Sequence, residues 1–193
     1  MKRVLAIVSV GVLVGFATTA VADDDHDNGR GTGQRVFRAQ LVGFNEVPSV
    51  STPAHGTFYA VLNKDETELT YWLSFSGLIA PTSQAHIHFG QHHTAGAISV
   101  WLCEASAAAP TASTPACGAA NSTEGQVTGV LTSAEVIGPA GQGIGVNEFA
   151  ELVAAMRAGA AYANVHSAIS PTPTPPPAPG TQFPGGEIRG QIH

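Results

Sequence analysis

The sequence predicts a mostly β protein: an antiparallel Greek-key β-sandwich or barrel of about eight strands with one short helix. The clearest strand signal lies in residues 67–75, where apolar and polar side chains alternate along the whole segment. Other short segments of strand composition recur along the chain, and turn-forming residues separate them. Only one segment, residues 147–159, carries apolar side chains at helical spacing.

Each expected strand is short, rich in β-branched or aromatic residues, and bounded by Gly, Pro, Asn or charged residues. The expected strands are residues 36–41, 56–62, 67–75, 84–89, 97–102, 125–131, 161–166 and 186–192. The second and third form a hairpin, because the polar turn 63–66 joins them. The helix should begin at Asn147, whose side chain can cap free amides, and should end at Gly159.

The N-terminal segment has the features of a secretory signal peptide. Within residues 1–22, Lys2 and Arg3 precede an apolar run too short to span a bilayer comfortably, and a small-residue cleavage site follows. Residues 23–34 are acidic and glycine-rich, so we expect a disordered lead-in there. The remaining residues, 35–193, are expected to form one β domain in a secreted or periplasmic protein.

Charge narrows the range of partners. The chain has a formal net charge of −6, and removal of the basic leader makes it more acidic. Because nucleic acids and anionic membranes attract positive charge, neither is an expected partner. No later apolar run is long enough to span a membrane, so the mature chain should lack a membrane span. An unidentified protein or small ligand is the remaining class of partner.

Cys103 and Cys117 are the only cysteines. In an exported protein such a pair predicts a disulfide, here stapling an insertion of small residues at 103–124. A pair of thiolate metal ligands is the competing interpretation. A second irregular segment, the proline-rich stretch 170–184, should be an extended and solvated loop.

Three histidines suggest a metal site. On a strand, His86 and His88 project to one face while Ile87 and Phe89 project to the other. With His166 from a later strand, they would give three imidazoles and one open position, which suits copper or zinc. Copper is the leading expectation because Cu(II) heads the affinity order. The alternative is an ordinary solvated or hydrogen-bonded strand face.

Four motifs also occur along the chain in a fixed order: Phe44-Asn45-Glu46-Val47-Pro48, Ala85-His86-Ile87-His88-Phe89-Gly90, Tyr162-Ala163-Asn164-Val165-His166-Ser167 and Gly186-Glu187-Ile188-Arg189-Gly190-Gln191-Ile192. Together they resemble a CHRD (chordin-type) domain over roughly residues 35–192. The resemblance implies an extracytoplasmic β domain, widespread in bacteria and also found in chordin, with no firmly established biochemical activity. The chain departs from that pattern in its proline-rich loop and in its cysteine-bearing insertion.

A fainter resemblance concerns the copper side of copper/zinc superoxide dismutases. It rests on His86-Ile87-His88, on Val165-His166 and on Arg189, and it implies copper ligands at the histidines and anion steering by the arginine. The bridging histidine and the zinc loop of those enzymes have no clear counterpart here. A structural alternative for Arg189 is a pair with a carboxylate that pins the last strand, Glu187 sharing its strand face.

The remaining histidines and the catalytic motifs complete the interpretation. His92, His93 and His55 are the candidates for a fourth metal ligand. Catalytic residues are unknown, since the sequence has no Gly-x-Ser-x-Gly elbow and no His-Glu-x-x-His helix. The favoured interpretation is a binding module with a mononuclear copper site. The alternatives are a metal-free structural or adhesive interaction domain, and a superoxide-dismutase-like copper redox enzyme.

Overall fold

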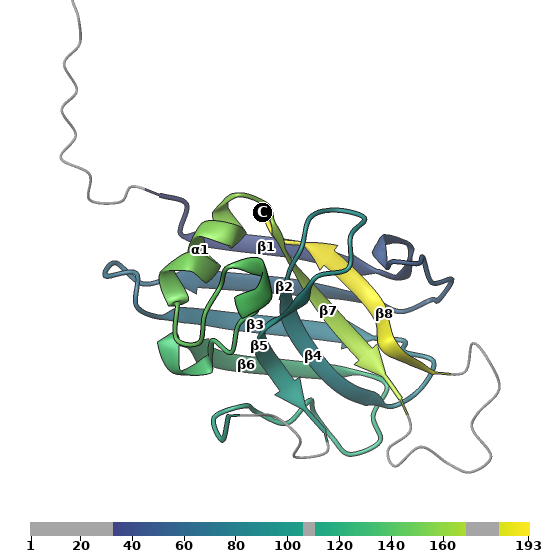
Figure 1. Cartoon of the computed structure of the whole chain (residues 1–193). Coiled ribbons are helices and arrows are strands. Elements are labelled where there is room, and N and C mark those ends of the chain that lie inside the picture. Colours follow the sequence, from purple (N-terminus) through teal and green to yellow (C-terminus); the bar gives the residue numbers. More distant parts are fainter. Residues whose placement is uncertain (1–32, 106–110, 169–181) are drawn as a thin grey trace, which may run out of the picture. The chain divides into compact units, whose positions relative to one another are not determined.

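The computed structural model describes residues 33–105, 111–168 and 182–193, and it confirms the predicted fold class (Figure 1). Its strands are β1 (Val36–Val42), β2 (His55–Leu62), β3 (Leu69–Ser76), β4 (Thr82–Phe89), β5 (Ala97–Glu104), β6 (Gly125–Leu131), β7 (Ala161–Ser167) and β8 (Phe183–Gln191). One α-helix, α1 (Phe149–Arg157), and three single-turn 3-10 helices at 43–45, 133–135 and 140–142 complete the described elements.

Several expectations fall outside these ranges. The signal peptide, nearly all of the acidic lead-in, and most of the proline-rich loop lie outside the described residues. The end of that loop is described and differs from the expectation, because β8 already begins at Phe183.

All strand pairs are antiparallel and belong to one sheet of order β5-β4-β7-β8-β1-β2-β3-β6. Strands β1, β2 and β3 follow one another as neighbours, whereas β6, β7 and β8 join the sheet through long connections. In Figure 1, β5, β4, β7 and β8 cross in front of the layer formed by β1, β2, β3 and β6. The continuous sheet therefore folds over on itself.

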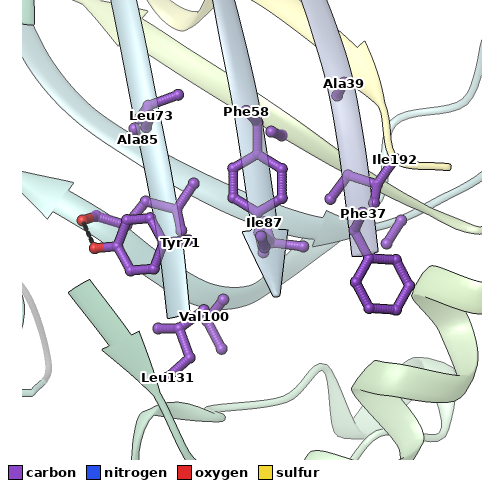
Figure 2. Close-up of a cluster of buried hydrophobic side chains, with 14 of the residues drawn as sticks. Phe37, Ala39, Phe58, Tyr71, Leu73, Ala85, Ile87, Val100, Leu131 and Ile192 are labelled. Atoms are coloured by element: carbon purple, nitrogen blue, oxygen red, sulfur yellow. Dashed lines mark hydrogen bonds between the residues drawn. The ribbon is translucent and has the colours of Figure 1, made fainter. Parts of the chain in front are cut away.

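The core lies between these two layers. Figure 2 shows side chains from both layers meeting there, including Phe37, Phe58, Leu73, Ile87 and Val100. The Tyr71 hydroxyl donates a hydrogen bond to the Leu102 carbonyl, which satisfies a buried polar group and ties β3 to β5. The alternation predicted from residues 67–75 is confirmed, since the apolar set of that strand is buried.

The helix begins two residues later than predicted, and Asn147 does not cap it. Asn147 has a left-handed backbone (φ 67°), whereas a capping residue is normally extended. Glu148 occupies the capping position without a side-chain bond to the helix, and its carboxylate accepts instead from the Gly145 amide. The other end agrees with the prediction, because Gly159 is left-handed just beyond α1. Within the described ranges no helix is long and apolar enough to cross a bilayer.

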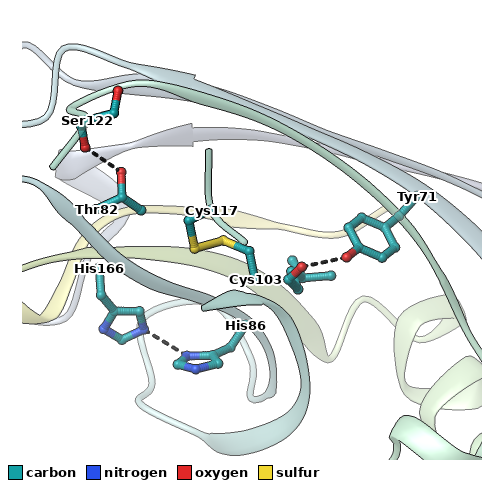
Figure 3. Close-up of a disulfide and its surroundings, with 8 residues drawn as sticks. Tyr71, Thr82, His86, Cys103, Cys117, Ser122 and His166 are labelled. Carbon is teal, nitrogen blue, oxygen red and sulfur yellow. Dashed lines mark hydrogen bonds between the residues drawn. A yellow bond between two sulfur atoms is a disulfide. The ribbon is translucent and has the colours of Figure 1, made fainter. Parts of the chain in front are cut away.

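The predicted disulfide between Cys103 and Cys117 is confirmed (Figure 3). Both cysteines are buried, and the bond links the end of β5 to the insertion. Next to it, Glu104 and Ala116 form an isolated parallel bridge. The alternative of two thiolate metal ligands is therefore wrong.

Replacing both Cys103 and Cys117 by Ala should lower the free energy of unfolding by about 3 kcal/mol, as expected for a cross-link that closes a loop of this size. The two cysteines are 14 residues apart. Urea denaturation of the oxidised wild type and of the variant measures the difference. Equal stability of the two proteins would show that the bond contributes nothing.

Candidate metal centre

Strand register brings the three histidines to one face. In the pairing of β4 with β7, His86 lies opposite Asn164, and His166 lies opposite Gln84. Side chains at alternate positions share a face, so His86, His88 and His166 all project from the side of the sheet opposite the apolar core. The same pairing directs Ile87 into the core, where it is fully buried.

This outer face is not solvated. The exposed fractions are 0% for His86, 9% for His88 and 5% for His166. The Trp101 ring meets His86 edge to face at 4.3 Å between centroids, and the Tyr162 ring lies parallel to His88 at 4.8 Å. The solvated form of the alternative interpretation is therefore wrong, whereas a hydrogen-bonded strand face remains the alternative to a metal site.

The ligand atoms of the three imidazoles lie within 4.8 Å of one another. Nδ1 of His86 and Nε2 of His166 are 3.0 Å apart (Figure 3). Two nitrogens bound to one tetrahedral zinc ion are about 3.3 Å apart, given bonds of about 2.0–2.1 Å, and two neighbouring nitrogens of a square-planar Cu(II) ion are somewhat closer. The pair of His86 and His166 is therefore already near coordination distance, while the most widely separated ligand atoms of the group would have to approach by up to about 1.5 Å.

Backbone carbonyls hold the second nitrogen of two of the rings. His166 Nδ1 lies 2.9 Å from the Pro184 carbonyl oxygen, and His88 Nδ1 lies 3.0 Å from that of Gly96. Carbonyls only accept hydrogen bonds, so both Nδ1 atoms carry the hydrogen and both Nε2 atoms keep a lone pair. This is the outer support that histidine ligands to metals typically have.

His86 differs from the other two. Because His166 Nε2 has a lone pair, the short contact requires His86 Nδ1 to donate a hydrogen bond to it. The other nitrogen, His86 Nε2, is buried and has no hydrogen-bond partner among the described residues, and the same holds for His88 Nε2. A bound metal would replace the contact between His86 and His166, with the His86 hydrogen moving to Nε2.

Burial keeps all three imidazoles neutral. It lowers the pKa of His86 to about 2, with the neighbouring His166 and His88 contributing, and it lowers the pKa of His88 and of His166 to about 4. Neutral imidazole is the form that binds metals, so protons do not compete for these nitrogens near pH 7.

The loop before β5 covers His88 and is held at two points. The backbone amide of Gly96 donates to the Tyr162 hydroxyl at 3.1 Å, while the Gly96 carbonyl accepts from His88. A side chain at Gly96 would meet the Phe89 carbonyl oxygen at 1.9 Å, so only glycine allows this close approach. The tautomer of His88 thus depends on the position of this loop.

Arg189 provides the second point. Its guanidinium lies 3.4 Å from the centre of the Tyr162 ring and donates to the carbonyls of Thr94 and Gln91 at 2.9 and 2.8 Å. Arg189, Tyr162 and His88 consequently form one stack of planar groups under the loop.

Arg189 therefore pins a loop through its carbonyls, and the expected partner Glu187 is engaged elsewhere. Glu187 is fully buried and accepts hydrogen bonds from the Thr52 hydroxyl, the Ile79 amide and the Ser167 hydroxyl. Among the described residues Arg189 makes no salt bridge with a carboxylate. With an exposed fraction of 2%, Arg189 also gives no support to anion steering.

Sequence reasoning did not assign Tyr162 or Asn164 to the site. Asn164 lies two residues before His166 on β7, and its amide donates to the buried Glu46 carboxylate. Burial raises the pKa of Glu46 to about 7, although nearby Arg189 opposes the shift. Asn164 and Glu46 each stand within one of the four sequence motifs, but only long-range packing shows that they contact each other.

The candidates for a fourth ligand do not join the group. His55 lies on β2, exposed, with Nε2 3.3 Å from the Ser76 hydroxyl. His92 and His93 are exposed in the loop between β4 and β5. The metal-binding group found within the described residues contains none of the three.

A family model described as CHRD domain matches residues 37–173. The chain belongs to the CHRD-domain family. The matched span of this CHRD domain includes all three clustered histidines, while the motif in β8 lies beyond it. Neither the curated proteins nor the solved structures contain a significant match.

We expect the metal-free CHRD domain to lose stability as the pH falls from about 6.5 to 4.5. Because the three histidine pKa values are lower in the folded chain, the unfolded chain is protonated first as the pH falls. Each histidine then lowers the free energy of unfolding by about 1.4 kcal/mol per pH unit. Glu46 has the opposite effect, because its pKa is raised in the folded chain. Its contribution to stability is fully present below the pKa that it has in the unfolded chain, and it is lost as the pH rises through about 7. The summed effect of three histidines on the free energy of unfolding exceeds that of one glutamate, so stability should fall as the pH falls.

Urea denaturation in EDTA between pH 4.5 and 7.5 measures this dependence. His55→Ala should leave the slope unchanged because His55 is exposed. A stability that stays flat below pH 6.5 would contradict neutral burial of the group.

Replacing Arg189 by Lys should lower the free energy of unfolding by about 1–3 kcal/mol and so lower the melting temperature. Lysine keeps the charge but cannot span two carbonyls while stacking on an aromatic ring. A residue that serves only to steer anions would tolerate this change. An unchanged melting temperature would therefore contradict the role of Arg189 in holding the loop through the Gln91 and Thr94 carbonyls.

Proposed function

We propose that this protein is an exported CHRD-domain binding module that carries a mononuclear metal site at His86, His88 and His166. The observation that carries the proposal is the cluster of three neutral, buried imidazoles with ligand atoms within 4.8 Å of one another. The leader in the sequence and the disulfide support a secreted or periplasmic location.

The ligand set favours copper, with zinc as the alternative. All three ligands are imidazoles, and the disulfide leaves no thiolate to compete. Imidazole suits both ions, and Cu(II) binds more tightly than Zn²⁺ to a given nitrogen site. With three protein ligands, a bound ion would keep a position for an exogenous ligand. Gly96 and Pro184 would orient two of the rings through their carbonyls.

A metal-free role as a structural or adhesive domain is the second candidate. The contact of His86 with His166 favours it, because that hydrogen bond links β4 to β7 without any metal. A purely structural His88 should nevertheless have its buried nitrogens satisfied, and its Nε2 has no partner in the described part of the chain, whereas a bound metal would supply one. A superoxide-dismutase-like activity has less support, because Arg189 is buried and held by carbonyls.

Titration of the purified, metal-free chain with Cu(II) tests the proposal. We expect one tight equivalent, loss of that equivalent in His88→Ala, and a higher melting temperature for the copper-loaded wild type, since a ligand that binds only the folded state stabilises it.

His55→Ala and His92→Ala are matched controls, since both residues are exposed and outside the cluster. Both variants should still bind one equivalent of Cu(II) tightly. Equal uptake by wild type and by folded His88→Ala would contradict the site, and so would the absence of uptake.

A further inference from the structure

A second surface lies on the outer face of β1, β2, β3 and β6, the layer behind β4 and β7 in Figure 1. Strand register arranges its side chains in rows that cross all four strands. One row consists of Arg38, Tyr59, Trp72 and Thr128, and the next consists of Gln40, Thr57, Ser74 and Gln126. We refer to these two rows as the platform. Alternate residues of the same strands fill the core, so the platform points away from it.

The first row presents aromatic rings to solvent. Tyr59 and Trp72 lie 5.5 Å apart between ring centres, and the Arg38 guanidinium lies 5.5 Å from the Tyr59 ring. Trp72 is 46% exposed, although a large aromatic side chain is normally well buried. A cross-strand pair that served only to stabilise the sheet would gain more from being covered.

The second row offers hydrogen-bonding groups beside the rings. It consists only of amides and hydroxyls, and the Thr57 and Ser74 hydroxyls are 2.7 Å apart. All four of its residues line a groove of about 610 Å³, which His55 and Glu124 also line. An apolar ring surface is thus continuous with a row of donors and acceptors.

We propose that the platform binds an uncharged oligosaccharide. A pyranose ring has an apolar face of C–H groups and a polar edge of hydroxyls, and it needs both kinds of surface side by side. The rings of Trp72 and Tyr59 would receive the C–H face. The amides of Gln40 and Gln126, which can both donate and accept, would hydrogen-bond the hydroxyl edge.

Charge supports an uncharged ligand. The whole chain has a net charge of −6, yet the platform contains no carboxylate, and its one cation, Arg38, lies against Tyr59. A cationic partner would find no counter-charge on the two rows and only one carboxylate, Glu124, in the groove beside them, and a polyanion would be repelled by the acidic chain. A second copy of the chain fits less well, because more than half of the platform's side chains carry amide or hydroxyl groups.

Native electrophoresis of the full chain in gels cast with hydroxyethyl cellulose, glucomannan or arabinoxylan tests this proposal. We expect at least one of these neutral polysaccharides to retard the wild type. Trp72→Ala should weaken the association constant by about tenfold or more, because a stacked ring is lost. Gln126→Ala should weaken it by about threefold, because one hydrogen-bonding group is lost.

Two controls separate the platform from the rest of the molecule. Val146→Ala changes a side chain that is 65% exposed but outside the platform, and His88→Ala changes the metal centre. Both should be retarded like the wild type, provided that their melting curves show folded protein. Failure of all three polysaccharides to retard the wild type would overturn the proposal. Equal retardation of wild type and Trp72→Ala would also overturn it, as would a dimer on gel filtration that Trp72→Ala dissociates.

Discussion

The antiparallel pairing of β4 with β7 is the constraint on which the histidine cluster depends. Its register aligns His86 with Asn164 and Gln84 with His166, so that imidazoles distant in sequence project from one face. A slip of one residue would turn the side chains of either strand to the opposite face. The apolar side chains next to the histidines prevent such a slip, because Ile87 and Val165 are fully buried on the core side.

The outer face of these strands is polar and yet covered, and this combination gives the histidines their chemistry. Exclusion of water lowers their pKa values and keeps them neutral. The Gly96 and Pro184 carbonyls then decide which nitrogen of His88 and of His166 keeps a lone pair. Arg189 and Tyr162 hold the covering loop in place. The outer face of β1, β2, β3 and β6 contrasts with it, because Trp72 remains half exposed there.

Local patterns were sufficient to predict the strands, the helix and the shared face of His86 and His88, but not that His166 lies beside them. Alternation identified β3, Gly159 identified the helix end, and two cysteines in an exported chain predicted the disulfide. Local patterns could not predict which residues pack together across the sheet. Nothing next to Arg189 in the sequence indicates that its partners are the Gln91 and Thr94 carbonyls, and nothing near His86 reveals that Trp101 covers it. Asn147 failed as a cap because its backbone is left-handed, a conformation that its residue type tolerates.

Anomalous diffraction at the copper edge, from crystals grown with one equivalent of Cu(II), tests the central claim most directly. The account predicts one strong peak about 2.0–2.1 Å from a nitrogen of each of His86, His88 and His166, with Gly96 and Pro184 still bonded to two of the rings. Copper bound only elsewhere on the chain, with the contact of His86 and His166 intact, would contradict it.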